Sequence, residues 1–432
     1  MIWNEPIETM SRDEMHALQS ERLKDTVARV YQNVEFYRTK MQALGIEPGD
    51  IKSIDDIVKL PFTTKKDLRD NYPFGICSAP QSEFVRIHAS SGTTGKPTAV
   101  PHTRKDLDMF SECSARSICC AGGTKDDTIQ VSYGYGLFTG GLGLHDGATR
   151  LGAGVIPASS GNTRNQLTLM KDFNPTILAC TPSYAMFLAE ALADDGTKPE
   201  DIALRIGIFG AEPWSKEMKA KIEAGLGITA HDIYGLSEIM GPGVSCSCQM
   251  QNGLHVCEDH FYPEILDPDT LLPVADGIAG ELTFTHLTKE AMPLLRYRTR
   301  DLSSLDHSPC DCGRTSVRMA RIIGRTDDML IIRGVNVFPS QIESVLLEVP
   351  EVSPNYVIIV DRQGVLDTIE IQVELNPEYM SDSVTEMEEI RRKIKQKLDS
   401  VLRISVILTL AEHKTIARSQ GKAKRVIDKR TL

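Results

Sequence analysis

The sequence has no excess of positive charge and no long hydrophobic run, and both absences narrow the class of protein. It carries 48 basic residues against 59 acidic ones, a net charge of −11, which argues against a general affinity for nucleic acid or anionic membranes. No apolar run is long enough to span a bilayer, and the first residues lack the basic start and apolar core of an export signal. We therefore expect a cytoplasmic protein whose ten cysteines are thiols or metal ligands, not disulfides.

The length of 432 residues is too great for one compact core, so we expect a large unit and at least one smaller one. Residues 12–45 carry apolar residues at helical spacing and predict a pair of helices. Further along, short apolar runs alternate with helical stretches, which indicates an α/β unit with mostly parallel sheets. From about Cys246, turn signals separate short strands and indicate an antiparallel or barrel-like β subdomain. The helices of the α/β unit are expected near residues 163–173, 182–194 and 215–225.

The last part of the chain has a pattern of its own. Strands are expected at residues 355–360, 368–374 and 404–410, and a helix follows the capping box formed by Ser383 and Glu386. This pattern predicts a small α+β domain at residues 327–432, after a larger domain at residues 1–326. The apolar stripe of the helix is expected to consist of Val384, Met387, Ile390, Ile394, Leu398 and Val401.

A glycine- and hydroxyl-rich stretch from Ser90 to Thr98 is the clearest candidate for ligand binding. Its glycines allow the backbone N–H groups to approach a ligand, its hydroxyls add donors and Lys96 adds a positive charge, a combination that suits a polyphosphate. It lacks the Walker A spacing, because two residues instead of four separate Gly92 from Gly95 and Pro97 follows the lysine. Apolar segments on both sides predict that the loop joins two strands.

Several stretches, taken together, resemble the adenylate-forming acyl-CoA ligases and, within them, the phenylacetate–CoA ligase branch. They occur in the family's order along nearly the whole chain, and the conjunction is far more specific than any one of them. The stretches are Ser90 to Thr98, Tyr133 to Gly141, Phe209 to Pro213, Tyr234 to Glu238, Tyr297 to Asp301, Gly324 to Asp328, Arg333 to Pro339 and Gly421 to Arg425.

The resemblance implies a two-step reaction and a role for each motif. A carboxylate attacks the α-phosphate of ATP to give an acyl-adenylate and pyrophosphate, and the thiol of coenzyme A then displaces AMP. Glu238 is expected to bind Mg²⁺ and act in catalysis, with Ser237 near the α-phosphate and Asp301 on the ribose hydroxyls. The phosphate loop is expected to contribute Ser90, Ser91, Gly92, Thr93, Thr94, Gly95 and Lys96. The rest of the ATP site is expected to comprise Gly210, Ala211, Glu212, Asp232, Ile233, Tyr234, Gly235 and Arg325.

The same resemblance implies that Lys422 is the catalytic lysine that bridges the carboxylate and the α-phosphate. The small domain would turn about a hinge at Asp327, bringing this lysine in for the first step and removing it for the second. Ala417 and Gln420 stand where relatives often carry Pro and Glu, but the Gly-Lys pair is intact. A slot for a flat ring is expected from Tyr135, Phe138, Gly140 and Gly141, although aromatic residues in such a run often belong to the core.

The cysteines Cys310 and Cys312, with Cys248 and His255 upstream, form a possible closed set for structural Zn²⁺. Some members of the branch have such a site, with the first cysteine seven residues before the histidine, which favours Cys248 over Cys246. The alternative is ordinary reduced thiols on loops. Packing roles are expected for Cys77, Cys113, Cys119, Cys120 and Cys180.

The sequence is therefore interpreted as a ligase of phenylacetate, or of a related aryl or arylacetic acid, and coenzyme A, with ATP, Mg²⁺ and structural Zn²⁺. Its partners are expected to be small molecules, with no nucleic acid and no membrane, and a homodimer is a possible assembly. Two alternatives stay open: an adenylating enzyme with another acid or acceptor, as in the coenzyme F390 synthetases, or a nucleotide-binding regulator without turnover.

Overall fold

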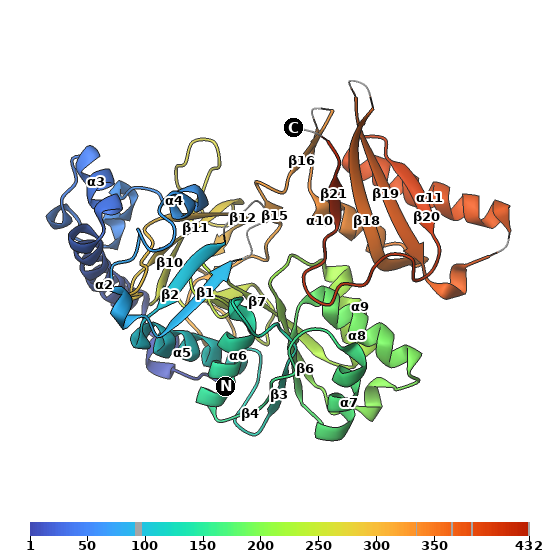
Figure 1. Cartoon of the computed structure of the whole chain (residues 1–432), viewed down its shortest axis with the longest axis horizontal. Helices are drawn as coiled ribbons and strands as arrows, with labels where there is room; N and C mark the ends of the chain where they lie inside the picture. Colours follow the sequence, from blue (N-terminus) through green and yellow to red (C-terminus); the bar gives the residue numbers. More distant parts are fainter. Residues whose placement is uncertain (91–96, 334, 364–365, 382, 431–432) are drawn as a thin grey trace.

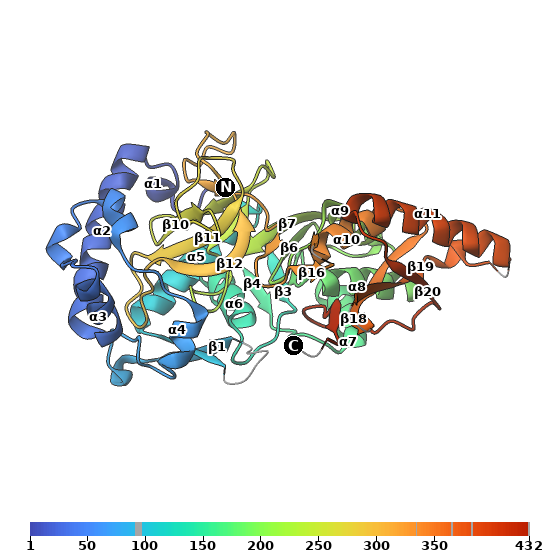
Figure 2. The same ribbon diagram turned by 90° about the horizontal axis from the view of Figure 1, so that it is seen from above.

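The computed structural model describes residues 1–90, 97–333, 335–363, 366–381 and 383–430. Figure 1 shows a large body that contains the N-terminal three quarters of the chain and a smaller C-terminal body beside it. Figure 2 shows the same two bodies following one another along the longest axis, with helices α8, α9 and α10 where they meet. In the part of the chain that the structure describes, no helix is long and apolar enough to cross a bilayer.

The N-terminal helices pack against the β subdomain rather than forming a domain of their own. Ser11 caps the second helix through a capping box with Glu14, and Thr64 caps the fourth in the same way with Asp67. The predicted helix pair at residues 12–45 is thereby confirmed. The helices are α1 (Glu5–Glu8), α2 (Arg12–Asn33), α3 (Glu35–Ala43) and α4 (Lys65–Asp70), with 3-10 turns at Pro48–Asp50, Ile54–Lys59 and Gln81–Glu83.

A nine-stranded mixed sheet, in the order β13-β14-β9-β8-β7-β6-β5-β3-β4, is the centre of the large body. Five strands are parallel, as the alternating pattern predicts: β3 (Thr128–Val131), β4 (Gly154–Ile156), β5 (Ile177–Cys180), β6 (Ile206–Gly210) and β7 (Thr229–Tyr234). Antiparallel pairing then adds β8 (Ser245–Ser247), β9 (Leu254–Val256), β14 (Arg318–Met319) and β13 (Leu305–Asp306). The helices are α5 (Arg104–Cys120), α6 (Thr139–Leu151), α7 (Thr163–Phe173), α8 (Pro182–Asp194) and α9 (Lys216–Leu226), with a 3-10 turn at Pro199–Asp201.

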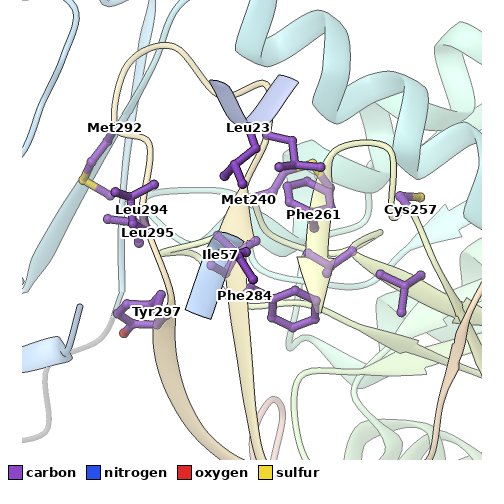
Figure 3. Close-up of a cluster of buried hydrophobic side chains, with 14 of the residues drawn as sticks. Leu23, Ile57, Met240, Cys257, Phe261, Phe284, Met292, Leu294, Leu295 and Tyr297 are labelled. Carbon is purple, nitrogen blue, oxygen red and sulfur yellow. The ribbon is translucent and has the colours of Figure 1, made fainter. Parts of the chain in front are cut away.

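The strands predicted from about Cys246 are antiparallel, but β8, β9, β13 and β14 extend the nine-stranded sheet, and others form a separate four-stranded sheet. Its order is β10-β11-β12-β15, formed by β10 (Phe261–Leu266), β11 (Gly280–His286), β12 (Tyr297–Ser303) and β15 (Gly324–Arg325). Figure 3 shows its core, a cluster of buried side chains that includes Leu23 of α2 together with Phe261, Phe284 and Leu294. These side chains are fully buried, so their burial contributes on the order of 2 kcal/mol each and fixes α2 to this sheet.

The C-terminal body has its own hydrophobic core and a sheet in the order β20-β19-β18-β21. Ser383 caps α11 as predicted, but Glu386 does not complete the capping box, because its carboxylate accepts a hydrogen bond from the hydroxyl of Ser381. The elements are β16 (Leu330–Ile332), β17 (Val335–Val337), α10 (Pro339–Leu347), β18 (Val352–Gln363), β19 (Leu366–Leu375), a 3-10 turn at Pro377–Tyr379, α11 (Val384–Leu402), β20 (Ile407–Ala411) and β21 (Val426–Asp428).

The predicted apolar stripe of α11 is wrong at both ends. Val384 is 77% exposed and Val401 is 51% exposed, whereas Leu402, which was not assigned to the stripe, is buried with Ile394 and Leu398. Figure 2 shows that the N-terminal end of α11 extends beyond the strands that it covers, so Val384 is exposed, whereas Met387 and Ile390 of the predicted stripe pack against the core and are partly buried.

Candidate active site

The phosphate loop joins two strands, as predicted. Strands β1 (Arg86–Ser90) and β2 (Thr98–His102) pair antiparallel with Ser90 opposite Thr98. The buried hydroxyls of these two residues have no hydrogen-bond partner among the residues that the structure describes. The rest of the predicted phosphate-binding set, Ser91, Gly92, Thr93, Thr94, Gly95 and Lys96, lies outside the described residues.

Close backbone approaches explain two of the glycines beside the predicted adenine slot. A Cβ atom on Gly210, at the end of β6, would lie 2.0 Å from the carbonyl oxygen of Ile233 on β7, and one on Gly235 would lie 1.7 Å from the carbonyl oxygen of Gly241. Ala211 follows with a positive φ of 74°, a conformation that costs free energy in a residue with a side chain and is often found at functional sites.

Asp301 is held rigidly between two partners from different elements. Its carboxylate accepts a hydrogen bond from the Tyr234 hydroxyl at 2.7 Å and one from Arg325 Nη1 at 2.8 Å. Burial raises the pKa of Asp301, and the guanidinium of Arg325 opposes that shift. A fixed carboxylate of this kind, at the junction of β7, β12 and β15, can accept hydrogen bonds from vicinal hydroxyls such as those of a ribose.

Asp232 has partners of its own. Its carboxylate forms an ion pair with Arg321, in which the Nε–Oδ2 distance is 3.1 Å, and the Arg321 guanidinium lies 4.5 Å from the centre of the Trp214 ring. Sequence reasoning did not identify Arg321 or Trp214, because the pair is formed by residues that lie far apart in the chain. The backbone N–H of Asp232 also donates to the Ser247 hydroxyl at 2.9 Å, so the role of Asp232 in the predicted adenine slot stays a prediction.

Glu238 is a nearly buried carboxylate with unused acceptor capacity. It is 4% exposed, and its Oε1 has no hydrogen-bond partner in the described part of the chain. Lys65, the first residue of α4, brings its Nζ to 3.4 Å from this oxygen. Next to it, the hydroxyl of Ser237 is 3.3 Å from the Thr139 hydroxyl. A buried carboxylate oxygen that accepts no hydrogen bond from the described residues suits a further cation. Lys65 was not predicted here.

Lys422 enters this site from the C-terminal body. Its Nζ lies 5.7 Å from the centre of the Phe138 ring. Burial lowers the pKa of Lys422, whereas the negative charges of Glu212, Glu238 and Asp301 raise it. The predicted lysine is thus within electrostatic range of the predicted metal ligand and ribose ligand, although these residues are far apart in the sequence.

The predicted acid slot has only one residue placed beside Lys422, namely Phe138. The hydroxyl of Tyr135 lies 3.3 Å from His145 Nδ1. Cβ atoms on Gly140 and Gly141 would come within 2.7 Å of the Phe138 ring and 2.8 Å of the Gly134 carbonyl oxygen. Packing within the loop is thus enough to require both glycines, and their role in binding the acid stays a prediction.

The four predicted zinc ligands converge. Their ligand atoms all lie within 4.8 Å of one another, with 3.8 Å between the sulfurs of Cys248 and Cys310 and 3.3 Å between the Cys312 sulfur and His255 Nε2. The other ring nitrogen of His255 is 3.0 Å from the Ser316 hydroxyl. By contrast, Cys246 faces α5, with its sulfur 3.4 Å from the Ser117 carbonyl oxygen, so the choice of Cys248 agrees with the geometry.

The cysteines assigned to packing are mostly buried. Cys113, Cys119, Cys120 and Cys180 are buried, and Cys77 is half-buried against the core. Cys113 also lies near Glu112 and His260, a second group with ligand atoms in reach of one another. That carboxylate already accepts a 2.6 Å hydrogen bond from Arg116, so the group is part of a salt-bridge network.

Comparison with known proteins places the chain in a family. The profile of the AMP-binding enzymes matches residues 21–287, and that of the AMP-binding enzyme C-terminal domain matches residues 334–430. Phenylacetate-coenzyme A ligases from Thermus thermophilus and Escherichia coli are 48% and 50% identical to it. The alignments cover 100% of both chains for the former, and 99% of this chain and 98% of its relative for the latter.

Solved structures show which arrangement of the two bodies this chain has. It matches 2-hydroxyisobutyryl-CoA ligase in the postadenylation state, in complex with 2-HIB-AMP, with a TM-score of 0.93, 28% identity and coverage of 99% of this chain and 92% of the other. Against the same enzyme in the thioesterification state, with CoA bound, the coverage is equal, the identity is 29% and the TM-score falls to 0.74. The two bodies are therefore arranged as in the postadenylation state. Together with the profile matches, this shows that the chain belongs to the family of AMP-binding enzymes, with both the main region and the C-terminal domain of that family.

Proposed function

We propose that the chain is an AMP-forming acid–thiol ligase that joins phenylacetate, or a related aryl or arylacetic acid, to coenzyme A through an acyl-adenylate. The observation that carries this proposal is that Lys422 of the small domain lies beside Phe138 of the large one, where the charges of Glu238 and Asp301 act on its ammonium. It is supported by full-length similarity to phenylacetate-coenzyme A ligases. A lysine within electrostatic range of two buried carboxylates is what a reaction between a carboxylate and a triphosphate needs.

In the first step, a carboxylate oxygen of the acid attacks the α-phosphorus of ATP, and the bond from that phosphorus to the bridging oxygen breaks. Pyrophosphate leaves with the electron pair of that bond. The ammonium of Lys422 would lie between the attacking carboxylate and the α-phosphate and offset the charge that brings them into repulsion. Asp301, fixed by Tyr234 and Arg325, would hold the ribose, and the loop after Ser90 would hold the outer phosphates.

Magnesium is implied by the family and by the donor set. Glu238 fits it, because a hard cation prefers carboxylate oxygens and Oε1 of this buried side chain is unpartnered among the described residues. When bound, Mg²⁺ would supply charge neutralisation on the phosphates. Lys65, with its Nζ 3.4 Å from this oxygen, forms an ion pair with Glu238 in the structure.

In the second step, the thiolate of coenzyme A attacks the acyl carbonyl, and the bond from the carbonyl carbon to the phosphate oxygen breaks to release AMP. This step involves no attack on phosphorus, so Lys422 is no longer required. We place the hinge at Asp327, between β15 of the large body and β16 of the small one. Its carboxylate pairs with Arg325, with Nε 2.9 Å from Oδ1, and that pair would have to adjust when the small domain turns.

Structural zinc is the second component that we propose. Three sulfurs and one imidazole suit a closed tetrahedral site. For Zn–S bonds of about 2.3 Å, tetrahedral geometry requires sulfurs about 3.8 Å apart, and the Cys248–Cys310 distance is 3.8 Å. The hydrogen bond between His255 Nδ1 and Ser316 would orient the ring so that Nε2 faces the metal.

The identity of the acid is the least constrained part of the proposal, because a structural relative acts on a hydroxy acid. The test is an AMP-release assay with phenylacetate, indoleacetate, benzoate and fatty acids, each with and without coenzyme A. We expect the highest kcat/KM with phenylacetate and product formation that requires coenzyme A. Adenylate formation without transfer to coenzyme A would favour another acceptor. No AMP release with any acid would favour a regulator.

The expected cytoplasmic location and the possible homodimer remain predictions.

A further inference from the structure

The loop that carries Lys422 is held on the large body by contacts immediately before and after the lysine. On one side, the hydroxyl of Thr181 donates a hydrogen bond to the carbonyl oxygen of Gly421 at 3.0 Å. On the other side, the backbone N–H of Ala423 donates to Glu212 Oε2 at 2.8 Å. These contacts fix the backbone of Lys422 from both directions.

The side chain of Glu212 is itself held in place. Its Oε1 accepts a 2.7 Å hydrogen bond from the backbone N–H of Ser183, in the first turn of α8. Thr181 is the N-cap of the same helix. The carboxylate therefore bridges the start of α8 and the loop of the small domain. Thr181 follows strand β5 and Glu212 follows strand β6, at the same edge of the parallel sheet.

The charge of Glu212 also favours the lysine directly. Its carboxylate is the strongest of the negative charges that raise the pKa of Lys422 against the effect of burial. Burial raises the pKa of Glu212 itself, and the hydrogen bonds from Ser183 and Ala423 oppose that shift. A carboxylate that accepts two N–H groups at such distances makes charge-assisted hydrogen bonds, which are the stronger kind.

We infer that Glu212 and Thr181 are positioning residues for adenylate formation. Together they form a docking site that holds the Lys422 loop in this orientation and must release it before transfer to coenzyme A. Sequence reasoning assigned Glu212 to the adenine slot, whereas its carboxylate is already engaged by two backbone N–H groups. The inference rests on the proposed function for the identity of the two steps, but the contact itself does not depend on the acid.

One further contact between the two bodies is an exposed ion pair. The ion pair between Lys414 and Asp194, at 2.7 Å, joins side chains that are 50% and 58% exposed, and exposed pairs contribute little. It also lies away from the lysine loop in sequence. Lys414→Ala is therefore a matched control, since it removes a contact between the bodies but leaves the contacts of Thr181 and Glu212 with the Lys422 loop intact.

The test uses Glu212→Gln, which keeps the size of the side chain. The amide can accept one N–H but must turn its NH₂ group toward the other, so one contact is lost together with the charge. We expect the kcat of adenylate formation, measured by pyrophosphate exchange, to fall roughly 10- to 100-fold. The KM for ATP should be unchanged. Thioester formation from purified acyl-adenylate and coenzyme A should be equal to or faster than in the wild type, and Lys414→Ala should change neither step.

Three results would overturn the inference: a rise in the KM for ATP without a fall in kcat, equal losses in both steps, or no effect. If Glu212→Gln does not fold, as judged by its melting temperature, Glu212→Asp takes its place, because it keeps the charge but is too short to bridge both N–H groups.

Solution scattering supplies a readout that needs no turnover. The wild type should give a profile that fits this arrangement of the two bodies, and Glu212→Gln should shift away from it while Lys414→Ala does not. Identical profiles for wild type and Glu212→Gln would also overturn the inference. Failure of the proposed function would be recognised separately, since the wild type itself would then release no AMP with any acid.

Discussion

Replacement of one zinc ligand should destabilise the protein far more than replacement of another cysteine of similar exposure. Cys312→Ser removes a sulfur 3.3 Å from His255 Nε2 and leaves three ligands for a metal that prefers four in structural sites. Cys77→Ser is the matched control, because both cysteines are half-buried and Cys77 lies outside the metal-binding group.

The magnitude follows from the segments that the metal would join. His255 and Cys310 are separated by about 55 residues, and closing a loop of that length with a crosslink contributes roughly 4 kcal/mol on the chain-entropy estimate. Pairing of β9 with β14 already restricts this loop, so we expect a loss of about 2–4 kcal/mol. At about 2 °C per kcal/mol for a protein of this size, Cys312→Ser should melt roughly 4–8 °C below the wild type.

The assay combines metal analysis with thermal unfolding. Protein purified without chelators should contain one zinc per chain, Cys312→Ser should contain much less, and the control should match the wild type in both measurements. A wild type without zinc, or a Cys312→Ser variant with the same melting temperature as Cys77→Ser, would refute the reasoning. The three cysteines would then be ordinary reduced thiols beside a histidine.

Two further predictions concern a buried histidine and the hinge. Burial lowers the pKa of His231 to about 4 from a usual value of 6.5, so the unfolded chain binds its proton at higher pH than the folded one. Stability should therefore fall by about 2 kcal/mol between pH 7.5 and pH 5 on account of this group. In denaturant titrations at the two pH values, His231→Gln should lose less free energy of unfolding than the wild type. His16→Gln, at an exposed site, should lose as much as the wild type. Equal losses for all three proteins would contradict this role of His231. Asp327→Pro fixes φ at the hinge, and should keep pyrophosphate exchange while lowering thioester formation from acyl-adenylate about tenfold or more; wild-type rates in both would argue for a fixed site.

Local patterns were sufficient for most of the fold. The helices at Thr163–Phe173 and Pro182–Asp194 have the predicted bounds, because apolar spacing, a threonine cap and flanking turns act within a few residues. The ends of α11 were wrong because a helical stripe shows which face can be buried, whereas only the neighbouring strands decide how far along the helix that burial extends. Val384 has the right spacing but no sheet beneath it.

The site was predictable only where sequence motifs carry it. The family resemblance predicted Lys422, Glu238 and Asp301, and in the structure the charges of the two carboxylates act on the lysine. Lys65 and Thr181 belong to no such motif, and their partners, Glu238 and Gly421, lie more than a hundred residues away in the chain. Glu212 shows the same limit: its position in a motif suggested the nucleotide, and only the fold shows the backbone groups that its carboxylate binds.

The most direct test of the account is the effect of Lys422→Ala on the two half-reactions measured separately. The ammonium lies 5.7 Å from the centre of the Phe138 ring, and the charges of three carboxylates raise its pKa. Loss of one such electrostatic contact should cost on the order of 3 kcal/mol, or roughly 100-fold, in the step that attacks phosphorus. We predict that loss in pyrophosphate exchange with phenylacetate, together with thioester formation from purified phenylacetyl-adenylate at the wild-type rate. Equal losses in both half-reactions would contradict the assignment of Lys422 and, with it, the two-step account of this site.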